Sequence, residues 1–460
     1  MQTRLEHDFL GSKAIPKNAL YGIHTFRTME NFSISGISLL PEMVVAYAHL
    51  KKACAQANHS FGLLPEKITT PLLRACDEII DGKHMDQFLM DVFQAGAGTS
   101  TNMNLNEVIA NRALEIMGEE KGNYKVVSPN DHVNMAQSTN DTYPSAMRVA
   151  IVIRFDGLDR SLEHLQRSFQ KKAVQFKKVI KAARTHLQDA TPITLGQEFS
   201  AYSKTIVGLR KQLARARDSI AVLGIGGSAV GTGLNVHSGY PKRVVRYLNK
   251  NTKFCFKSAL DLVESMQSQR QMLEFSSCLK QIAVEVSRIA SDLRLLSSGP
   301  NTGFAELILP AVQPGSSMMP GKVNPSILEC VNMVCYRVMG SEATVLHCVH
   351  GGQLDLNVNM PLMSYEVLTS MTILKNVITM MSEKCIEGIE ANKKQCEKYV
   401  YLSASLATSL NPIIGYSKVA EIVQEFVTTG KPLPEIILKK NILTKKEVEE
   451  LLNPLKMIRS

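Results

Sequence analysis

Two adjacent hydroxyls and a lysine stand in a segment that cannot be regular helix or strand. Residues 315–325 contain two glycines and two prolines, which break both kinds of element. Ser316 and Ser317 supply the hydroxyls, and Lys322 supplies a full positive charge. Asn324 followed by proline predicts a helix N-cap, whose free N–H groups favour anions. The segment therefore predicts a loop that grips a carboxylate, or else an ordinary connection before a capped helix.

Three further segments place hydroxyl and amide side chains where helical periodicity begins or breaks. These segments are Gly96–Glu107 with Thr99, Asn134–Pro144 with Ser138, Thr139 and Asn140, and Ala183–Gln197 with Thr185 and His186. Helix capping explains one Ser or Asp in each segment, and a lone His is more often a packed residue than a catalyst. Taken together, the four segments offer donors suited to a small dianion, without a phosphate cradle or metal-ligand spacing.

Such a set of donors fits one type of reaction. Removal of a proton from a carbon next to a carboxylate creates a dianionic aci-carboxylate. Preorganised donors aimed at that oxygen pair would then be the main catalytic contribution, with each lost donor costing about 3 kcal/mol of barrier.

Long helices must position these segments. From about residue 140 to 394 the apolar residues recur at helical spacing, most clearly over 275–296 and again over 367–385, where steps of four and three alternate. Val284, Leu295, Ile373 and Val377 add apolar positions beside these two seams. Helices that are apolar on more than one stripe must be buried on several sides. We therefore expect a mainly α protein that associates with copies of itself.

Changes of composition along the chain predict three domains. Residues 1–139 form a mixed, mostly helical N-terminal domain, and 140–394 form a central domain of long helices. Residues 395–460 form a small helical C-terminal domain, where Asn411-Pro412 and Gly430 break the helices into short pieces.

Two motifs predict no cofactor site. Gly224–Gly233 contains G-x-G-x-x-A, but it follows a helical stretch rather than a strand, so we interpret it as a turn and not as a dinucleotide site. His347 and His350 lie three residues apart but have no further ligands nearby in sequence. We expect these two histidines to pack against other residues rather than to bind metal.

The bulk composition limits where the protein works and what it binds. The chain has 460 residues, 45% hydrophobic and 20% charged, with no apolar run long enough for a membrane span and a polar N-terminus without a signal core. Nine cysteines without metal or redox spacing predict free thiols and a cytoplasmic location. The net charge of +10 is dispersed in sequence, so we expect a solvated surface; a nucleic-acid partner would require one basic face.

The loop carries a specific resemblance. Its pattern Gly-Ser-Ser-x-Met-Pro-x-Lys-x-Asn-Pro resembles the signature of the aspartase/fumarase superfamily, lyases that release fumarate. The three segments described above resemble further blocks of that family. The resemblance implies a three-domain lyase fold with a central bundle of long helices that packs into a tetrameric multi-helix core. It also implies a small dicarboxylate substrate and no cofactor, whereas divalent-cation activation cannot be inferred from sequence. The dispersed charge and the lack of a long apolar run predict neither nucleic acid nor membrane as a partner.

The resemblance also implies a role for each matching residue. Ser316 is the base that takes the Cβ proton, and Lys322 is its cationic neighbour. His186 lies near the departing amine and is oriented by Glu329. The implied substrate-binding residues are Thr99, Ser138, Thr139 and Ser317 at the β-carboxylate, Thr185 and Asn324 with Lys322 at the α-carboxylate, Asn140 near the amine, and Met319 in the loop.

Three segments resemble the aspartase branch more than the fumarase branch. They are Gly22-Ile-His-Thr, residues 292–300 and residues 352–357, and His24 in the first is interpreted as a buried, hydrogen-bonded structural residue. This likeness implies the reversible deamination of L-aspartate to fumarate and ammonia; hydration of fumarate to L-malate is the alternative. A non-catalytic relative is a third possibility, and the intact Ser316 and Lys322 argue against it.

Overall fold

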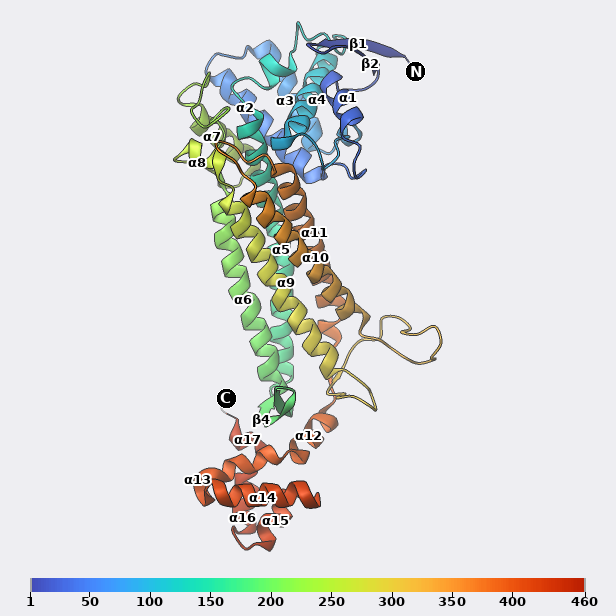
Figure 1. The fold of residues 1–460 in the computed structure, drawn as a ribbon, viewed down its shortest axis with the longest axis vertical. Helices are drawn as coiled ribbons and strands as arrows, with labels where there is room; N and C mark the ends of the chain where they lie inside the picture. Colours follow the sequence, from blue (N-terminus) through green and yellow to red (C-terminus); the bar gives the residue numbers. More distant parts are fainter. Residues whose placement is uncertain (1, 459–460) are drawn as a thin grey trace. The chain divides into compact units, whose positions relative to one another are not determined.

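The computed structural model describes residues 2–458. Residue 1 of the expected N-terminal domain and residues 459–460 of the expected C-terminal domain lie outside the described residues. The fold is mainly α, as the sequence predicts, with four small two-stranded sheets in the described residues (Figure 1). The chain divides into two compact units. Unit 1 comprises Met1–Asp159, Lys211–Ala283 and Arg337–Leu374; unit 2 comprises Arg160–Arg210, Val284–Tyr336 and Lys375–Ser460. The division into three domains stays a prediction.

The first part of unit 1 is a hairpin followed by short and medium helices. Its elements are β1 (Thr3–Asp8), β2 (Gly11–Pro16), α1 (Ile23–Asn31), α2 (Pro41–Ser60), α3 (Glu66–Ile80), η1 (Met85–Gln87), η2 (Gly96–Gly98), α4 (Thr99–Met117) and η3 (Pro129–Val133). Later in the chain come β5 (Val222–Leu223), α7 (Tyr240–Thr252), β6 (Lys257–Ser258) and α8 (Leu262–Gln267). Helix α2 packs against α3 and α7, and α4 packs against α1 and α3.

Five long helices each contribute residues to both units. They are α5 (Thr139–Gln175), α6 (Leu195–Ile220), α9 (Arg270–Leu296), α10 (Ser326–His350) and α11 (Met360–Lys384). Polar contacts join neighbouring helices: Lys280 Nζ lies 2.6 Å from Glu342 Oε2 between α9 and α10, and Arg154 Nη2 donates to Thr372 Oγ1 between α5 and α11.

The two predicted seams are buried. Phe275, Leu279, Ile282, Val286, Ile289, Leu293 and Leu296 of α9 are all at most 8% exposed, and so are Val367, Met371, Leu374, Ile378, Met381 and Cys385 along and just after α11. Apolar burial of this kind is what stabilises long helices, because intrinsic propensity alone is weak. The helical periodicity in the sequence is therefore confirmed.

Unit 2 adds a hairpin and a set of short helices. The hairpin pairs β3 (Ile180–Thr185) with β4 (Gln188–Thr194), and β7 (Leu307–Ile308) pairs with β8 (Glu390–Ala391). The short elements are η4 (Ile386–Gly388), α12 (Lys393–Leu402), η5 (Ala404–Leu410), α13 (Asn411–Ile414), α14 (Tyr416–Thr429), α15 (Leu433–Lys439), α16 (Lys445–Leu451) and α17 (Pro454–Met457). Their shared core includes Leu410, Ile422 and Ile437.

Helix α5 begins at Thr139, in agreement with the long helices expected from about residue 140, and it contains Pro144. The structure corrects one expectation about local structure. The interruption expected over residues 183–197 is an antiparallel hairpin of Ile180–Thr185 and Gln188–Thr194, and α6 already begins at Leu195. Among residues 2–458, no helix combines the length and the apolar character that crossing a bilayer requires.

Truncation of the α9 seam should destabilise the protein. Leu279 is 1% exposed, so Leu279→Ala leaves a cavity and should lower the free energy of unfolding by about 2–5 kcal/mol. Gln281→Ala, at an exposed position two residues away on the same helix, is the control and should change it by less than about 0.5 kcal/mol. Urea unfolding followed by circular dichroism measures both, and equal effects would contradict burial of the seam.

Candidate active site

Helix α4 begins at a backbone arrangement that only glycine can make. Gly98 has φ +85°, and a Cβ there would lie 2.0 Å from the Tyr143 ring. The Ala97 N–H donates to Val358 O at 2.7 Å, which fixes the turn before the helix. Thr99 is thereby held as the first residue of α4, where the backbone N–H groups have no partner within the helix.

The start of α5 is tied to α4 by amide side chains. Asn102 Nδ2 donates to Thr139 Oγ1 at 3.0 Å and to Asn134 Oδ1 at 3.2 Å. The Asn140 N–H donates to Ser138 Oγ at 3.2 Å. Unit 1 therefore brings together the start of α4 and the predicted residues Ser138, Thr139 and Asn140 in one polar cluster.

Lys51 of α2 supports this cluster, although the sequence analysis did not select it. Its side chain is 1% exposed, and Nζ donates to Asn134 Oδ1 at 3.0 Å and to Gln137 Oε1 at 2.9 Å. Burial lowers the pKa of Lys51 to about 8. The available signal was a lysine among buried apolar positions of α2, such as Tyr47, Leu50 and Cys54.

Asp141 holds the glycine-rich turn against the start of α5. Its carboxylate accepts hydrogen bonds from the N–H groups of Ser138, Gly226 and Ser228 at 2.9, 2.9 and 3.0 Å. Burial raises the pKa of Asp141 to about 6 in spite of these donors. Asn140 Nδ2 donates to Ala229 O at 2.8 Å, so the turn contacts a predicted site residue directly. The glycine-rich segment is thus a positioning turn, in agreement with the sequence interpretation.

The β3–β4 hairpin presents Thr185 and His186 at its tip. Thr185 pairs with Gln188, and the two residues between them, His186 and Leu187, have φ of +58° and +60°. Two positive φ values define a type I′ turn, which Asn-Gly normally occupies. A non-glycine residue in this conformation carries roughly 1 kcal/mol or more of strain. Thr185, His186 and Leu187 are all exposed in the single chain.

A buried carboxylate anchors the hairpin behind its tip. Glu306 is fully buried, and both of its oxygens lie 3.0 Å from Arg184 Nη1. The Arg184 guanidinium also lies 4.1 Å from the centre of the Phe304 ring and 5.2 Å from that of Tyr399. Lys181 Nζ adds an ion pair to Glu306 at 3.2 Å. Removal of one partner from a buried pair of this kind typically costs about 3–5 kcal/mol, so this group holds the hairpin rigidly.

The loop at residues 315–324 is closed at its neck. The Gly315 N–H donates to Lys322 O at 2.7 Å, and Asn324 Nδ2 donates to Gly315 O at 2.6 Å. A Cβ on Gly315 would lie 2.5 Å from Asn324 N, so the neck requires glycine. Helix α10 begins at Ser326, and Asn324 is therefore a neck residue and not the predicted N-cap.

The Ser316 hydroxyl is surrounded by donors from its own loop. Ser316 Oγ accepts hydrogen bonds from the N–H groups of Met318 at 3.2 Å and Met319 at 2.9 Å. Both donors favour negative charge on that oxygen. Ser317 and Lys322 are exposed, and in the part of the chain that the structure describes neither side chain bonds to Ser316.

The predicted residues are brought together in part. Thr99, Ser138, Thr139 and Asn140 belong to unit 1, and the remaining predicted residues belong to unit 2. Within unit 2, no described hydrogen bond or ion pair joins the hairpin to the loop. Glu329 lies 3.8 Å from Arg294 Nη2, and within residues 2–458 it does not contact His186. The assignment of these residues to one site stays a prediction.

His24 differs from its sequence interpretation. The ring is only partly buried, and its Nδ1 is enclosed without a hydrogen-bond partner among the described residues. Burial lowers the pKa of His24. It is therefore not the hydrogen-bonded structural imidazole that we expected.

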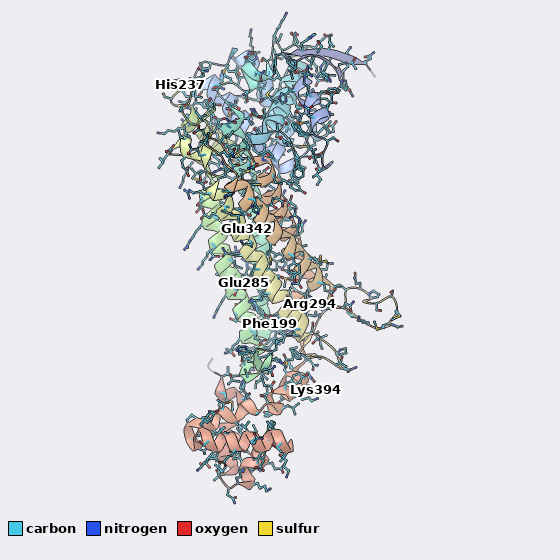
Figure 2. All side chains as sticks on the ribbon, in the orientation of Figure 1. Phe199, His237, Glu285, Arg294, Glu342 and Lys394 are labelled. Atoms are coloured by element: carbon cyan, nitrogen blue, oxygen red, sulfur yellow. The ribbon has the colours of Figure 1, made fainter. Side chains whose placement is uncertain are left out.

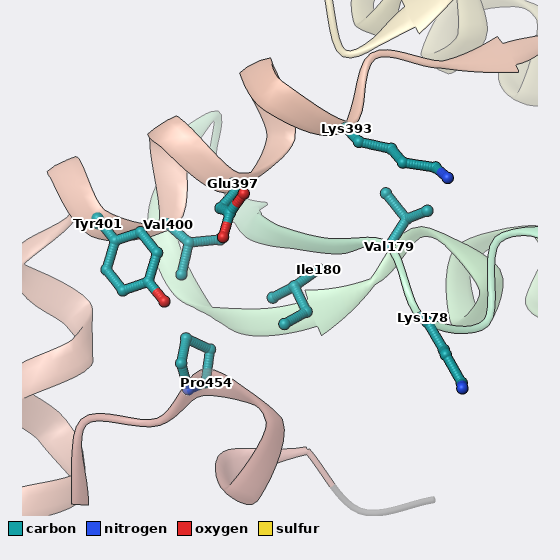
Figure 3. A pocket seen from close by; sticks show the side chains of 8 residues that line it. All are labelled: Lys178, Val179, Ile180, Lys393, Glu397, Val400, Tyr401 and Pro454. Atoms are coloured by element: carbon teal, nitrogen blue, oxygen red, sulfur yellow. The ribbon is translucent and has the colours of Figure 1, made fainter. Parts of the chain in front are cut away.

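A cavity in unit 2 is lined by none of the predicted site residues. It measures about 200 Å³ and is lined by Lys178, Val179, Ile180, Lys393, Glu397, Val400, Tyr401 and Pro454. Figure 3 shows Lys178 and Lys393 at one end of the lining and Tyr401 and Pro454 at the other. Both lysines are exposed and no buried polar side chain lines the cavity, so it offers less chemistry than the hairpin and the loop.

Comparison with known proteins identifies the class. Residues 11–340 match a family model described as lyase, and residues 406–459 match one described as the fumarase C C-terminus. The chain therefore belongs to the aspartase/fumarase superfamily of lyases, which confirms the resemblance found in the sequence.

Individual relatives narrow the comparison. The chain is 46% identical over 457 residues to the aspartate ammonia-lyase of Helicobacter pylori, covering 99% of this chain and 98% of that protein. It is 45% identical, with a TM-score of 0.97 and full coverage of both chains, to the fumarate lyase:delta crystallin from Brucella melitensis bound to cobalt. A class II fumarase from Schistosoma mansoni is 34% identical, with a TM-score of 0.96 and 99% coverage of both chains.

A metal site built from protein ligands would need several ligating side chains close together. Within residues 2–458, no three His, Cys, Asp or Glu side chains come together in this way. His347 and His350, the pair considered from the sequence, are both exposed.

Substitution of Gly98 tests the start of α4. Gly98→Ala combines an unfavourable positive φ with overlap of the Tyr143 ring, so it should lower the free energy of unfolding by several kcal/mol. Gly118→Ala is a matched control, because Gly118 has φ +79° but nothing within 4 Å of the added Cβ. The control should cost only about 1 kcal/mol. Equal losses in urea unfolding would mean that the Tyr143 contact does not constrain this turn.

Burial of Lys51 should produce a pH-dependent stability. Its folded pKa of about 8 lies below the unfolded value of about 10.4, so between these values the unfolded chain binds more protons. The free energy of unfolding of the wild type, relative to that of Lys51→Met, should therefore rise by up to about 3 kcal/mol between pH 8 and pH 10.4. Lowering the pH back to 8 should remove this gain. Denaturant unfolding across this window measures the difference, and a constant difference would refute the shift.

Proposed function

We propose that the chain catalyses the reversible deamination of L-aspartate to fumarate and ammonia, with Ser316 as the general base. The observation that carries the proposal is the environment of Ser316 Oγ, which accepts two backbone N–H groups at 2.9 and 3.2 Å. A serine hydroxyl is ordinarily a poor base. Two fixed donors stabilise its alkoxide form and so bring its basicity into a usable range.

The proposed reaction is an anti elimination. The Ser316 alkoxide takes a proton from Cβ, and the electron pair moves into the β-carboxylate to give a dianionic aci-carboxylate. The electron pair then forms the double bond as the amine leaves Cα. Thr99, Ser138, Thr139 and Ser317 would bind the β-carboxylate, where negative charge accumulates, and donors placed there lower the barrier.

The remaining residues would bind the other end of the substrate. Thr185, Lys322 and Asn324 would hold the α-carboxylate, with Met319 lining the loop. Asn140 and His186 would lie beside the departing amine, with Glu329 orienting His186. The contact of Asn140 with the Asp141-bound turn and the rigid hairpin behind His186 support these two roles. No step needs a cofactor, because hydrogen-bond donors stabilise the negative charge that accumulates on the aci-carboxylate.

We further propose that each site is completed by other copies of the chain in a homotetramer. Thr185, His186 and most of the loop are exposed in the single chain. On α10, Met333 and Tyr336 are 64% and 59% exposed, and large apolar side chains of this kind favour burial against another surface. The second apolar stripe inferred from the sequence supports the same arrangement, with Val284 of α9 44% exposed.

Fumarate hydratase is the alternative activity, because the same donors would bind L-malate. The higher identity to the aspartate ammonia-lyase than to the class II fumarase favours aspartate. We place the reaction in the cytoplasm, since all nine cysteines are free thiols, as a reducing compartment maintains them.

Removal of the Ser316 hydroxyl should abolish turnover. Ser316→Ala should lower kcat by at least about 10³-fold while the oligomer elutes unchanged from gel filtration, because the base is lost and the hydroxyl bonds, among the described residues, only to N–H groups of its own loop. Ser417→Ala, at an exposed serine of α14, is the matched control and should keep full activity. Fumarate absorbance measures the rate, and normal turnover by Ser316→Ala would exclude it as the base.

The substrate is tested separately from the mechanism. Formation of fumarate should be detected with L-aspartate and be much slower or absent with L-malate in a parallel assay. Activity with L-malate alone would show that the chain is a fumarate hydratase and not an aspartate ammonia-lyase. In that case Ser316→Ala would still test whether Ser316 is the base.

A further inference from the structure

One stretch of unit 1 carries basic residues with no acidic residue to balance them. No Asp or Glu occurs between Asp218 and Asp261, and six Lys or Arg residues lie in the second half of this interval. Five of them, here called the α7 basic stripe, are Lys242, Arg246, Lys250, Lys253 and Lys257. A nucleic-acid partner requires one basic face, and this stretch has the composition to form one.

Three members of the α7 basic stripe lie on one exposed face of the helix. Lys242, Arg246 and Lys250 follow at intervals of four, which places them on one side of α7 at roughly 6 Å steps. Lys253 is the residue that ends the helix, with φ +62°, and Lys257 follows in β6. The opposite side, with Val244 and Leu248, is buried. All five side chains of the stripe are exposed, and none forms an ion pair or hydrogen bond with a residue that the structure describes.

An exposed aromatic stack adjoins the start of the helix. The rings of His237 and Phe61 are stacked with centroids 4.0 Å apart, and the Arg243 guanidinium lies 4.9 Å from the Phe61 centroid. His237 is exposed, and its Nδ1 accepts the Gly239 N–H, which orients the ring. His237, labelled in Figure 2, lies in the segment that leads into α7. The outer face of this ring offers a flat platform.

We infer that α7 and its aromatic stack form a binding site for single-stranded nucleic acid. The α7 basic stripe would follow the phosphate backbone, and an unpaired base would stack on His237. A positively charged track combined with aromatic platforms is how proteins bind single strands without sequence preference. Nothing in this inference rests on the proposed reaction, since none of these residues belongs to the proposed catalytic or substrate-binding set.

The stack favours nucleic acid over other polyanions. An anionic membrane surface or an acidic protein segment would use the positive charges but would gain nothing from an oriented imidazole ring. Steering of a small dicarboxylate would likewise use only the charge. A base, in contrast, presents a π-face of the size of the His237 ring, and Arg243 beneath Phe61 adds a cation to the same stack.

The binding test uses the full-length protein and a labelled 20-nucleotide oligouridine. Fluorescence anisotropy at several salt concentrations should show saturable binding that weakens steeply with salt. If about four phosphates are neutralised, log K should fall against log salt with a slope of about −3. Oligothymidine of the same length distinguishes RNA from DNA as the source of the single strand, and binding of either supports the site. Absence of binding to both at about 50 mM salt would overturn it.

Charge reversal locates the site. Arg246→Glu with Lys250→Glu should weaken oligonucleotide binding at least tenfold while the lyase activity and oligomeric state stay at wild-type levels. Lys445→Glu with Lys446→Glu is the matched control, because it makes the same charge change at exposed positions of α16. Equal loss of binding in the two double variants would show that only the net charge matters and would refute a site on α7.

The stack is tested by His237→Ala, with two other polyanions for comparison. This variant should lower affinity for oligouridine roughly tenfold, the scale of one lost base–aromatic stack, and leave the affinity for inorganic polyphosphate unchanged. At the same salt concentration, the fraction of protein that co-sediments with vesicles of phosphatidylserine and phosphatidylcholine should be smaller than the fraction bound to oligouridine. Preferred binding to vesicles, or an unchanged oligouridine affinity in His237→Ala, would overturn the assignment to nucleic acid.

Discussion

Burial of apolar seams is the constraint on which the rest of the molecule depends. Once the seams of α9 and α11 face inward, the helix starts and the interruptions between helices are where most of the predicted polar side chains lie. The proposed chemistry lies at such places: Thr99 opens α4, Thr139 opens α5, and the loop precedes α10. Helix starts also leave backbone N–H groups without partners, so the same constraint that packs the helices supplies donors for an anion.

The sequence predicted what repeats and missed what depends on distant partners. Seven-residue repeats over 275–296 and 367–385 identified two of the long helices, and the spacing of glycine and proline identified the loop. The β3–β4 hairpin was missed because its strands are short and its turn, His186-Leu187, lacks the usual Asn-Gly signal. Asn324 was assigned to the wrong partner because its amide reaches Gly315, nine residues back, instead of the following helix.

The distribution of charge in the folded chain also could not be predicted from spacing in the sequence. In sequence the basic residues are dispersed, and those of α7 are no more closely spaced than others. Electrostatic potential depends instead on which charges share a face and which have a counter-charge nearby. Three members of the α7 basic stripe share one helix face, and none of its five members is ion-paired with a described residue, whereas Arg184 is paired with the buried Glu306.

The neck of the loop at residues 315–324 has an entropic consequence. Its two hydrogen bonds, from Gly315 N–H and from Asn324 Nδ2, close a short ring of chain at the moment of folding. The conformational entropy of that ring is therefore lost during folding and not during substrate binding, so this loss does not reduce binding affinity. Because the Ser316 oxygen and its two N–H donors belong to the same loop, this local electrostatic environment depends on no other element that the structure describes.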